Sequence, residues 1–375
     1  MRSAFGLGAR ILTFARPRFI AATAGVAMAV VIIFVEMGML YAVLDSQSLL
    51  ATRVRADLVA MNVARSNLHK WNRMEDVRLD EIAAVAGVER AVPIYQGTAT
   101  LRNPDDLRMH RIVVLAFPPD AVPLDIGDRA AIAAELRVPD SVLYDRLSRP
   151  IFGAIHPGED IEIDGTKSRV AGLVDIGPDV VNDGTLVMSE GTWLRRAGGD
   201  TPIMVAIDLK PGVDAAEAKR RILAATPADI AVFTTAEVRD REIAFTLRAV
   251  PVGILFGIGM IAGLVVGLVT CYQVLFNEVV DRIAQYATLK AMGFGDRFLS
   301  AVVIAQGLLL SCTGFAIGAG LSLVANTYIE RRTFIAADFG AVSVLAVFLA
   351  TVAICVGGSL LAVRQLYRLD PASLY

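Results

Sequence analysis

The sequence predicts an α-helical membrane domain with four transmembrane helices plus an α+β two-lobed extracytoplasmic domain. Two observations carry this fold class. The first is a set of long apolar runs, each reaching the roughly 20 residues that a helix needs to cross a bilayer. They are residues 19–44, 250–276, 299–325 and 341–363. The second is the ordinary soluble composition of residues 45–249 between the first two runs. The mean hydropathy of +0.56 and the 55% hydrophobic content are too high for a soluble chain of 375 residues.

The first run resembles a secretory signal at its start, because arginines precede the apolar stretch. The apolar part of a signal peptide, however, spans only about 7–15 residues. Residues 19–44 form a longer run, and only Glu36 interrupts it. We therefore expect an uncleaved anchor helix.

The orientation follows from the basic residues of the short segments, which favour the cytoplasmic side. Residues 1–18, 277–298 and 364–375 carry four, three and two arginines or lysines respectively. We expect a cytoplasmic amphipathic leader (1–18), a cytoplasmic coupling loop (277–298) and a cytoplasmic tail (364–375). The α+β domain (45–249) and the loop 326–340 then lie in the periplasm of an inner-membrane protein, although Arg331 and Arg332 weaken this signal.

The extracytoplasmic part divides at the turn-forming residues 118–123. We expect one lobe from residues 45–117 with 203–248, and a second lobe from 118–202. Helical spacing of apolar residues over 49–63 predicts that the first helix continues outward as a stalk. The remaining expected elements are helices at 79–86, 214–225 (N-cap Asp214) and 235–248, and strands at 91–101, 111–117, 159–164, 168–174, 185–189, 203–209 and 229–234. The strands at 159–164 and 168–174 are expected to form a hairpin that turns at Gly165.

The membrane helices carry small residues four apart, which let helix backbones approach closely in lipid. Five glycines in the second run form two interleaved registers of this kind, and the third run has a further pair. We expect helix packing at Gly253, Gly257, Gly259, Gly263, Gly267, Gly314 and Gly318. The alternative is the ordinary abundance of glycine in membrane helices.

Motifs for chemistry are absent from the sequence. It has no Walker A pattern, no CxxC, no HExxH and no GxSxG. His69, His110 and His156 are far apart in the chain, and the three cysteines all lie in the apolar runs. We expect no catalytic residue, no metal site and no enzyme activity of this chain by itself. The net charge of −2 indicates no nucleic-acid partner.

Glu36 is the one charged residue inside the four runs. Ion-coupled transporters usually keep carboxylates or histidines at the membrane midplane, so a secondary transporter is a poor fit. Two interpretations of Glu36 stay open. It meets a hydrated mouth or a partner on a neighbouring helix, or it simply reaches the outer interface.

The most informative short segment is NEVVDRIAQYATLKAMGFGDR, residues 277–297. It predicts a helix from about Glu278 to Met292, closed by Gly293 as a C-cap. We expect an apolar face at Val279, Ile283, Tyr286 or Ala287, Leu289 and Met292, and a cytosol-facing charged face at Glu278, Asp281, Arg282, Gln285 and Lys290. Such a helix could take a force from a cytoplasmic partner, or it could be an ordinary connector.

This segment resembles the coupling segment, NERxxEIGxLKAxGA, of ABC-transporter permeases of the MacB/FtsX/LolC type. The matching residues are Asn277, Glu278, Asp281, Arg282, Ile283, Tyr286, Thr288, Leu289, Lys290, Ala291, Met292 and Gly293. The tail Leu369–Ala372 and the four-helix layout also resemble this family. The chain departs from the pattern at Gln285, where an acidic residue is common. Within the family it looks most like the DevC subgroup of permeases without a fused ATPase domain.

The resemblance implies a permease subunit of an ATP-driven ABC exporter of the mechanotransmission type. Its implied partners are a separate ABC ATPase subunit that holds ATP and Mg, a second permease copy in a homodimer, a periplasmic membrane-fusion adaptor with an outer-membrane channel, and membrane lipids. No cofactor is expected on this chain itself. The implied substrate is a lipid, a glycolipid or another amphipathic molecule. Two alternatives share the fold: an FtsX-like regulator of a periplasmic cell-wall hydrolase, and a lipoprotein-release permease.

Overall fold

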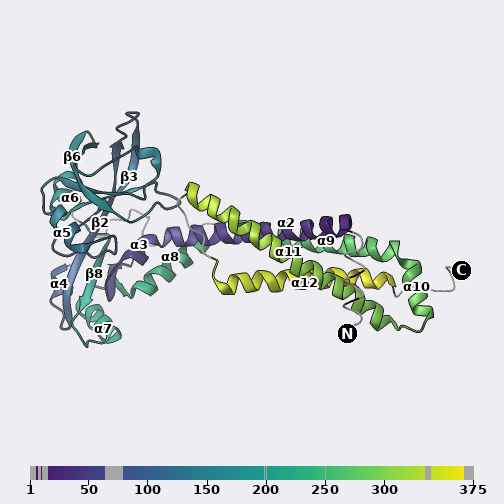
Figure 1. Cartoon of the computed structure of the whole chain (residues 1–375). Coiled ribbons are helices and arrows are strands. Elements are labelled where there is room, and N and C mark those ends of the chain that lie inside the picture. Colours follow the sequence, from purple (N-terminus) through teal and green to yellow (C-terminus); the bar gives the residue numbers. More distant parts are fainter. Residues whose placement is uncertain are drawn as a thin grey trace. The chain divides into compact units, whose positions relative to one another are not determined.

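The computed structural model describes residues 6, 10, 16–63, 79–197, 199, 201–249, 251–333 and 339–366. The chain forms two compact units (Figure 1). The helical unit is Met1–Ala42, Pro251–Arg332 and Ala336–Tyr375, and the α+β unit is Val43–Val250 with Thr333–Ile335. The predicted leader lies almost wholly outside the described residues, as do Leu369–Ala372 and His69.

Within its described residues, the helical unit is built from four long helices and one short one. They are α2 (Arg16–Gln47), α9 (Val252–Asp281), α10 (Ile283–Ala291), α11 (Asp296–Thr333) and α12 (Ala341–Leu366). The four long helices are each long and apolar enough to cross a membrane. They extend past the ends of most of the predicted runs, because the helical backbone bonds continue into the polar flanking residues. In particular, α11 reaches Thr333, well into the expected loop 326–340.

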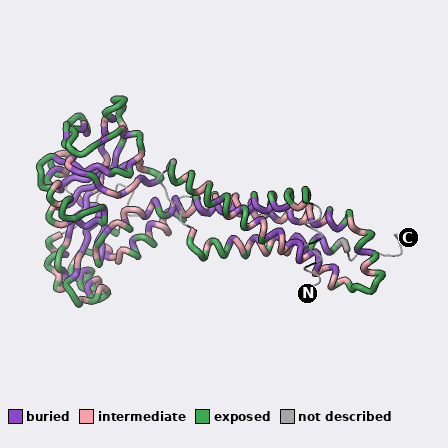
Figure 2. Tube along the Cα trace, in the orientation of Figure 1, coloured by how far each residue is buried: buried purple, intermediate pink, exposed green. Residues whose placement is uncertain are grey.

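Burial differs strongly among these helices (Figure 2). In α2, 50% of the most apolar window is buried within the chain, whereas in α9 only 11% is buried. A helix that is apolar all round needs lipid or another protein on its exposed faces. Helix α2 is therefore the central helix of the unit, and α9 presents the widest apolar outer surface.

The α+β unit carries nine strands within its described residues. The helices are α3 (Leu49–Arg53), α4 (Leu79–Ala83), α5 (Arg129–Leu136), α6 (Glu190–Ala197), α7 (Ala215–Ala225) and α8 (Thr235–Ala249), with a 3₁₀ turn η1 (Pro150–Phe152). The strands are β1 (Leu58–Asn62), β2 (Val88–Arg102), β3 (Met109–Phe117), β4 (Ser141–Asp145), β5 (Asp160–Ile163), β6 (Thr166–Val174), β7 (Thr185–Ser189), β8 (Met204–Leu209) and β9 (Ile230–Phe233).

One part of this unit is a four-stranded antiparallel sheet in the order β2-β8-β1-β9. Its chain order, β1-α4-β2 and then β8-α7-β9, is a repeated βαβ pattern of the ferredoxin-like kind. Ile82 of α4 and Ile222 of α7 are fully buried in one apolar cluster with Leu58 and Ile207. Asp214 caps α7 by accepting a hydrogen bond from the Glu217 N–H at 2.9 Å, which confirms the predicted N-cap.

The other part is a ring of six strands inserted between β2 and β8. The second half of β2 pairs with β3, and the ring continues through β7, β4, β6 and β5. A single residue pair, Leu101 with Ile163, closes β5 onto β2. The β5–β6 hairpin confirms the predicted hairpin. Its turn has Asp164 at φ 49° and Gly165 at φ 76°, as a type I′ turn requires.

The strand pairing corrects the expected division into lobes. The prediction grouped residues 45–117 with 203–248, but β3 pairs with β2 and β7 and belongs with residues 118–202. The reason is the length of β2. Its first half pairs with β8 as far as Ile94, and its second half pairs with β3 from Tyr95 onward. One strand thus serves both sheets.

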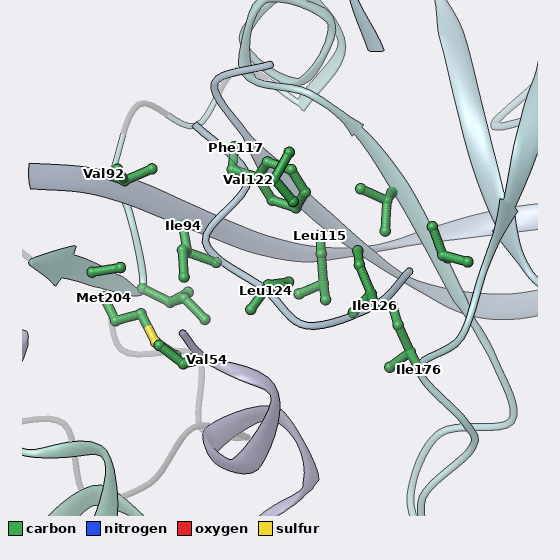
Figure 3. Packing of buried hydrophobic residues seen from close by; sticks show 14 of the residues in the cluster. Val54, Val92, Ile94, Leu115, Phe117, Val122, Leu124, Ile126, Ile176 and Met204 are labelled. Carbon is green, nitrogen blue, oxygen red and sulfur yellow. The ribbon is translucent and has the colours of Figure 1, made fainter. Parts of the chain in front are cut away.

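The predicted stalk over residues 49–63 is also corrected. Helix α2 ends at Gln47, α3 adds one short piece, and Val54 then forms a β-bridge with Leu124. Figure 3 shows Val54 packed in the apolar cluster with Leu115, Leu124 and Ile176. Residues 58–61 are buried in β1. A short run that is buried on both faces cannot be told from a helix by its spacing alone.

Candidate functional site

The segment 277–293 contains two helical pieces, which corrects the single helix predicted over 278–292. Helix α9 runs on to Asp281, and α10 begins at Ile283. Arg282 between them has φ −109° and ψ 19°, outside the helical region. Helix breaks usually occur at proline or glycine. Neither residue type lies at this break, so no local pattern in the sequence predicts it.

The C-terminal end of α10 is closed as the sequence predicted. Gly293 has φ 93°, which suits glycine because a side chain is strained there. The Gly293 N–H donates to the Lys290 carbonyl at 3.0 Å, and the Phe294 N–H donates to the Leu289 carbonyl at 3.1 Å. This pair of bonds is the Schellman motif. It turns the chain sharply at Gly293, and α11 begins three residues later.

The inner face of the segment is buried in the helical unit. Tyr286 and Ala287 are buried, and Tyr286 belongs to one apolar cluster with Leu275, Val279 and Leu299. Glu278 is also buried, with a side chain only 2% exposed, and its Oε1 lies 2.5 Å from Nε of Arg282. The prediction that Glu278 faces the cytosol is therefore wrong. Arg282 can neutralise it from one turn along, which makes its burial tolerable.

The outer face of the segment is a mixed surface of small, polar and apolar groups. Met292 is 62% exposed, and Phe294 just beyond Gly293 is 41% exposed. The exposed members of the segment are Asn277, Val280, Asp281, Ala284, Gln285, Thr288, Ala291, Met292 and Gly293. Ile283, Leu289 and Lys290 are half-buried between the two faces. A short helix with one anchored face and one mixed free face is suited to docking in a groove of another protein.

Two ion pairs connect the segment to neighbouring helices. Lys290 Nζ lies 3.1 Å from Asp296 Oδ1 at the start of α11. Arg18 near the start of α2 pairs with Asp281 at the end of α9. Both pairs are substantially exposed, and exposed pairs contribute only about 0–1 kcal/mol each. They set the register of the helix ends more than they stabilise the fold.

Helices α2 and α9 approach closely along the glycine register that contains Gly263 and Gly267. A Cβ added to Gly263 would lie 3.0 Å from Ile33 and 3.4 Å from the Ala29 carbonyl oxygen. A Cβ added to Gly267 would lie 3.0 Å from the Ala29 side chain and 2.7 Å from Ile354 of α12. Gly263 and Gly267 thus carry the contact with α2, and the absence of a side chain at these positions allows it.

The other predicted glycines differ in what an added Cβ atom would meet. Gly314 and Gly318 of α11 lie against α2, where added Cβ atoms would meet Val26 at 2.6 Å and the Ala27 carbonyl oxygen at 2.7 Å. A Cβ at Gly257, by contrast, would meet nothing within 4 Å, and Gly253 lies one turn earlier on α9. Sequence reasoning missed Gly307, whose added Cβ would meet the Cys355 carbonyl oxygen of α12 at 2.9 Å. No second glycine lies four residues away from it, so the spacing of glycines did not single it out.

Glu36 lies against α9. Its carboxylate occupies the space that a side chain at Gly259 would fill, so Gly259 and Glu36 fit together as a pair. Glu36 is half-buried. Within the described residues no cationic side chain pairs with it. The structure thus places the carboxylate beside a neighbouring helix, whichever of the two sequence interpretations applies.

Metal-binding side chains are scattered among the described residues. They contain no group of three histidine, cysteine or acidic side chains placed to hold a metal ion. His110 stacks edge-on against Phe152 at 6.1 Å between ring centroids, and His156 is exposed. The candidate site of this chain is the segment 277–293, which joins α9 to α11 and has a buried inner face and an exposed outer face.

The described residues combine four long apolar helices, an α+β insert after the first of them and a capped short helix between the second and third. Two family models match this chain: the MacB-like periplasmic core domain over residues 19–225, and the FtsX-like permease C-terminal domain over residues 248–371. The chain belongs to the MacB/FtsX/LolC-type permease family of ABC-type transporters. Permeases of this family are inner-membrane proteins with a periplasmic domain. No curated protein sequence matches the chain.

Solved structures similar to the chain cover about half of it. The periplasmic region of MacB from Actinobacillus actinomycetemcomitans is 10% identical, with a TM-score of 0.38, and the match covers 49% of this chain and 90% of that one. The extracellular domain of the noncanonical ABC-type transporter YknZ from Gram-positive bacteria is 12% identical, with a TM-score of 0.35, covering 48% and 99%. A permease-protein domain from Porphyromonas gingivalis is 14% identical, with a TM-score of 0.33, covering 47% and 88%.

Proposed function

We propose that this chain is the permease subunit of an ATP-driven exporter that works by mechanical transmission. A separate cytoplasmic ABC ATPase, holding ATP and Mg, docks on the outer face of segment 277–293. The four long helices cross the inner membrane, with both chain ends in the cytoplasm and the α+β unit in the periplasm. Two copies of the chain form the membrane part, each with its own ATPase subunit.

The observation that carries this proposal is the build of the segment 277–293. Its inner face is anchored by Tyr286 and Ala287, and its outer face is free. Helix α9 continues from it without interruption back to Val252. A push that reaches the C-terminal end of α9 therefore acts on one long helix, which is in close contact with α2 through Gly263 and Gly267. Both helices lead directly to the two ends of the α+β unit in the sequence.

The apolar helices carry almost no charge, which suits a transmitter better than a polar conduit. Glu36 is the one charged residue in the four predicted runs. Charged groups inside the membrane usually mark ion pathways. The substrate would then be taken up on the periplasmic side or from the outer leaflet. We propose a lipid, a glycolipid or another amphipathic molecule, passed on through a periplasmic adaptor and an outer-membrane channel.

A regulator of a periplasmic cell-wall hydrolase and a lipoprotein-release permease would share this architecture. The match of the MacB-like periplasmic core domain over residues 19–225 supports the exporter. Assignment to the DevC-like subgroup stays a prediction. The proteins that co-purify with the chain separate the three functions: an adaptor, a hydrolase or a second, different permease.

The experiment that tests the proposal is an affinity purification of the detergent-solubilised chain from its native membrane. The docking variant is Met292→Glu, on the outer face and 62% exposed. The matched control is Met109→Glu, on β3 of the α+β unit and 52% exposed. We expect an ABC ATPase and an adaptor with the unaltered chain, and at least a tenfold loss of the ATPase only with Met292→Glu. Recovery of no ATPase with the unaltered chain would overturn the proposal.

A further inference from the structure

The break at Arg282 poses a mechanical problem for a transmitting helix. A few residues outside the helical conformation act as a hinge that absorbs motion. With Arg282 outside the helical region, α10 could swing while α9 stayed still. Force on α10 reaches α9 only if something braces the break.

The side chains that span the break are spaced one helical turn apart. Glu278 precedes it by four residues, Arg282 lies at it, and Tyr286 follows by four. Residues four apart lie on the same helix face. Glu278 Oε1 and Arg282 Nε are 2.5 Å apart, with side chains only 2% and 19% exposed. The pair thus lies on the inner face, opposite the docking surface.

Tyr286 extends this line on the far side of the break. Its side chain is buried, and its hydroxyl donates to no acceptor among the described residues. Burial first, and the negative charge of Glu278 second, raise the pKa of Tyr286 to about 12, while Arg282 opposes the shift. The phenol therefore stays neutral, and the charges of both Glu278 and Arg282 act on it.

We propose that Glu278, Arg282 and Tyr286 are positioning residues that brace the α9–α10 break, so that displacement of α10 is passed on to α9. They would act by holding segment 277–293, on whose outer face the ATPase docks, and would themselves make no contact with the ATPase. That the brace matters for transport rests on the proposed function. That it holds α9 and α10 in a fixed geometry is independent of the proposed function.

A structural role alone would not need an ion pair here. Apolar side chains of similar volume often replace a buried ion pair without loss of stability. What they cannot supply is an attraction between opposite charges that holds Arg282 at the break against Glu278 on α9. The pair of Arg18 with Asp281 lies beside the same break but is exposed to solvent. It therefore serves as a control for the buried pair of Glu278 with Arg282.

The test measures the distance across the break in the full chain. Spin labels would be attached to Gln273→Cys on α9 and Thr288→Cys on α10, both exposed positions, after replacement of Cys271, Cys312 and Cys355. In lipid nanodiscs we expect one narrow distance distribution. The double variant E278M/R282M should at least double its width, and the charge swap E278R/R282E should restore most of it. Arg18→Gln should leave it unchanged.

The same variants report on coupling when the ATPase is added. E278M/R282M should retain co-purification of the ATPase within twofold and lose at least fivefold of the ATP hydrolysis that the permease stimulates. If the double variant yields too little folded protein, Arg282→Lys, which keeps the charge and loses the Nε contact, takes its place. An unchanged distance distribution in folded E278M/R282M or Arg282→Lys would overturn the brace. Absence of ATPase binding to the unaltered chain would overturn the proposed function and leave the brace to be decided by the distances.

Discussion

At the residue scale, two buried acids show how differently this fold accommodates a carboxylate. Glu278 is neutralised by a cation one turn away. Asp145, at the end of β4, is fully buried and accepts backbone hydrogen bonds instead. The Leu147 and Ile176 N–H groups donate to its Oδ1 at 3.1 Å each, and the Gly177 N–H donates to Oδ2 at 2.9 Å. Burial raises the pKa of Asp145, and these three donors oppose that shift.

The three donors make Asp145 the fastening point between β4 and the loop after β6. Asp145→Ala should leave them without an acceptor and cost about 2–4 kcal/mol. For a unit of this size that is a fall in Tm on the order of 5–15 °C. Asp175→Ala, which removes only the exposed pair with Arg146, should cost less than about 1 kcal/mol. Thermal unfolding of the purified chain measures both, and equal shifts for the two variants would contradict the assigned role.

At the element scale, the antiparallel pair α2–α9 depends on where glycine lies on α9. Gly263 and Gly267 lie against α2, whereas Gly257 meets open space. The same helix thus contains glycines that packing requires and at least one that it does not. In lipid, where helix association depends on close packing, this difference should be measurable.

Gly263→Leu should destabilise the helical unit, because the new side chain would meet Ile33 and the Ala29 backbone, and backbone cannot move aside cheaply. Overpacking of this kind costs about 1–3 kcal/mol. Gly257→Leu should change stability by less than about 0.5 kcal/mol. Unfolding in a detergent series would report both values. A larger loss for Gly257→Leu would mean that another surface, such as a second copy, covers that glycine.

At the scale of the whole molecule, the helical unit and the α+β unit each have their own core, and α2 runs from one into the other. If the long helices cross the membrane as proposed, the loops at their two ends lie in different compartments. Segment 277–293 and the β5–β6 hairpin should then be reachable only from opposite sides.

Labelling of single cysteines tests this orientation. In a variant without native cysteines, Asp164→Cys in the exposed hairpin turn should react with a membrane-impermeant maleimide in intact spheroplasts. Thr288→Cys on the exposed face of α10 should react only after the inner membrane is opened. The cysteine-free chain is the control. Labelling of Thr288→Cys in intact spheroplasts would reverse the predicted orientation.

The sequence was a good guide wherever the signal is local. The hairpin at Gly165, the cap at Asp214 and the C-cap at Gly293 are each set by the backbone preferences of one or two residues. The four long apolar helices were predictable because length and composition alone define them. The resemblance of segment 277–293 to a permease family likewise depended on residues close together in the chain, and the two family models confirm that family.

Features that depend on what lies opposite a residue were decided by the tertiary structure. Spacing could not show that Glu278 is buried, because the helix break at Arg282 changes the inner face and Arg282 neutralises the charge there. It could not choose between the two glycine registers of α9, because the difference lies in the side chains of α2. It could not assign β3 to its sheet, because β2 is long enough to serve two. The sequence by itself determined the apolar helices, their local caps and the family, since these follow from neighbouring residues. The packing partners, the break and the buried ion pair follow from contacts between distant segments, which only the folded chain brings together.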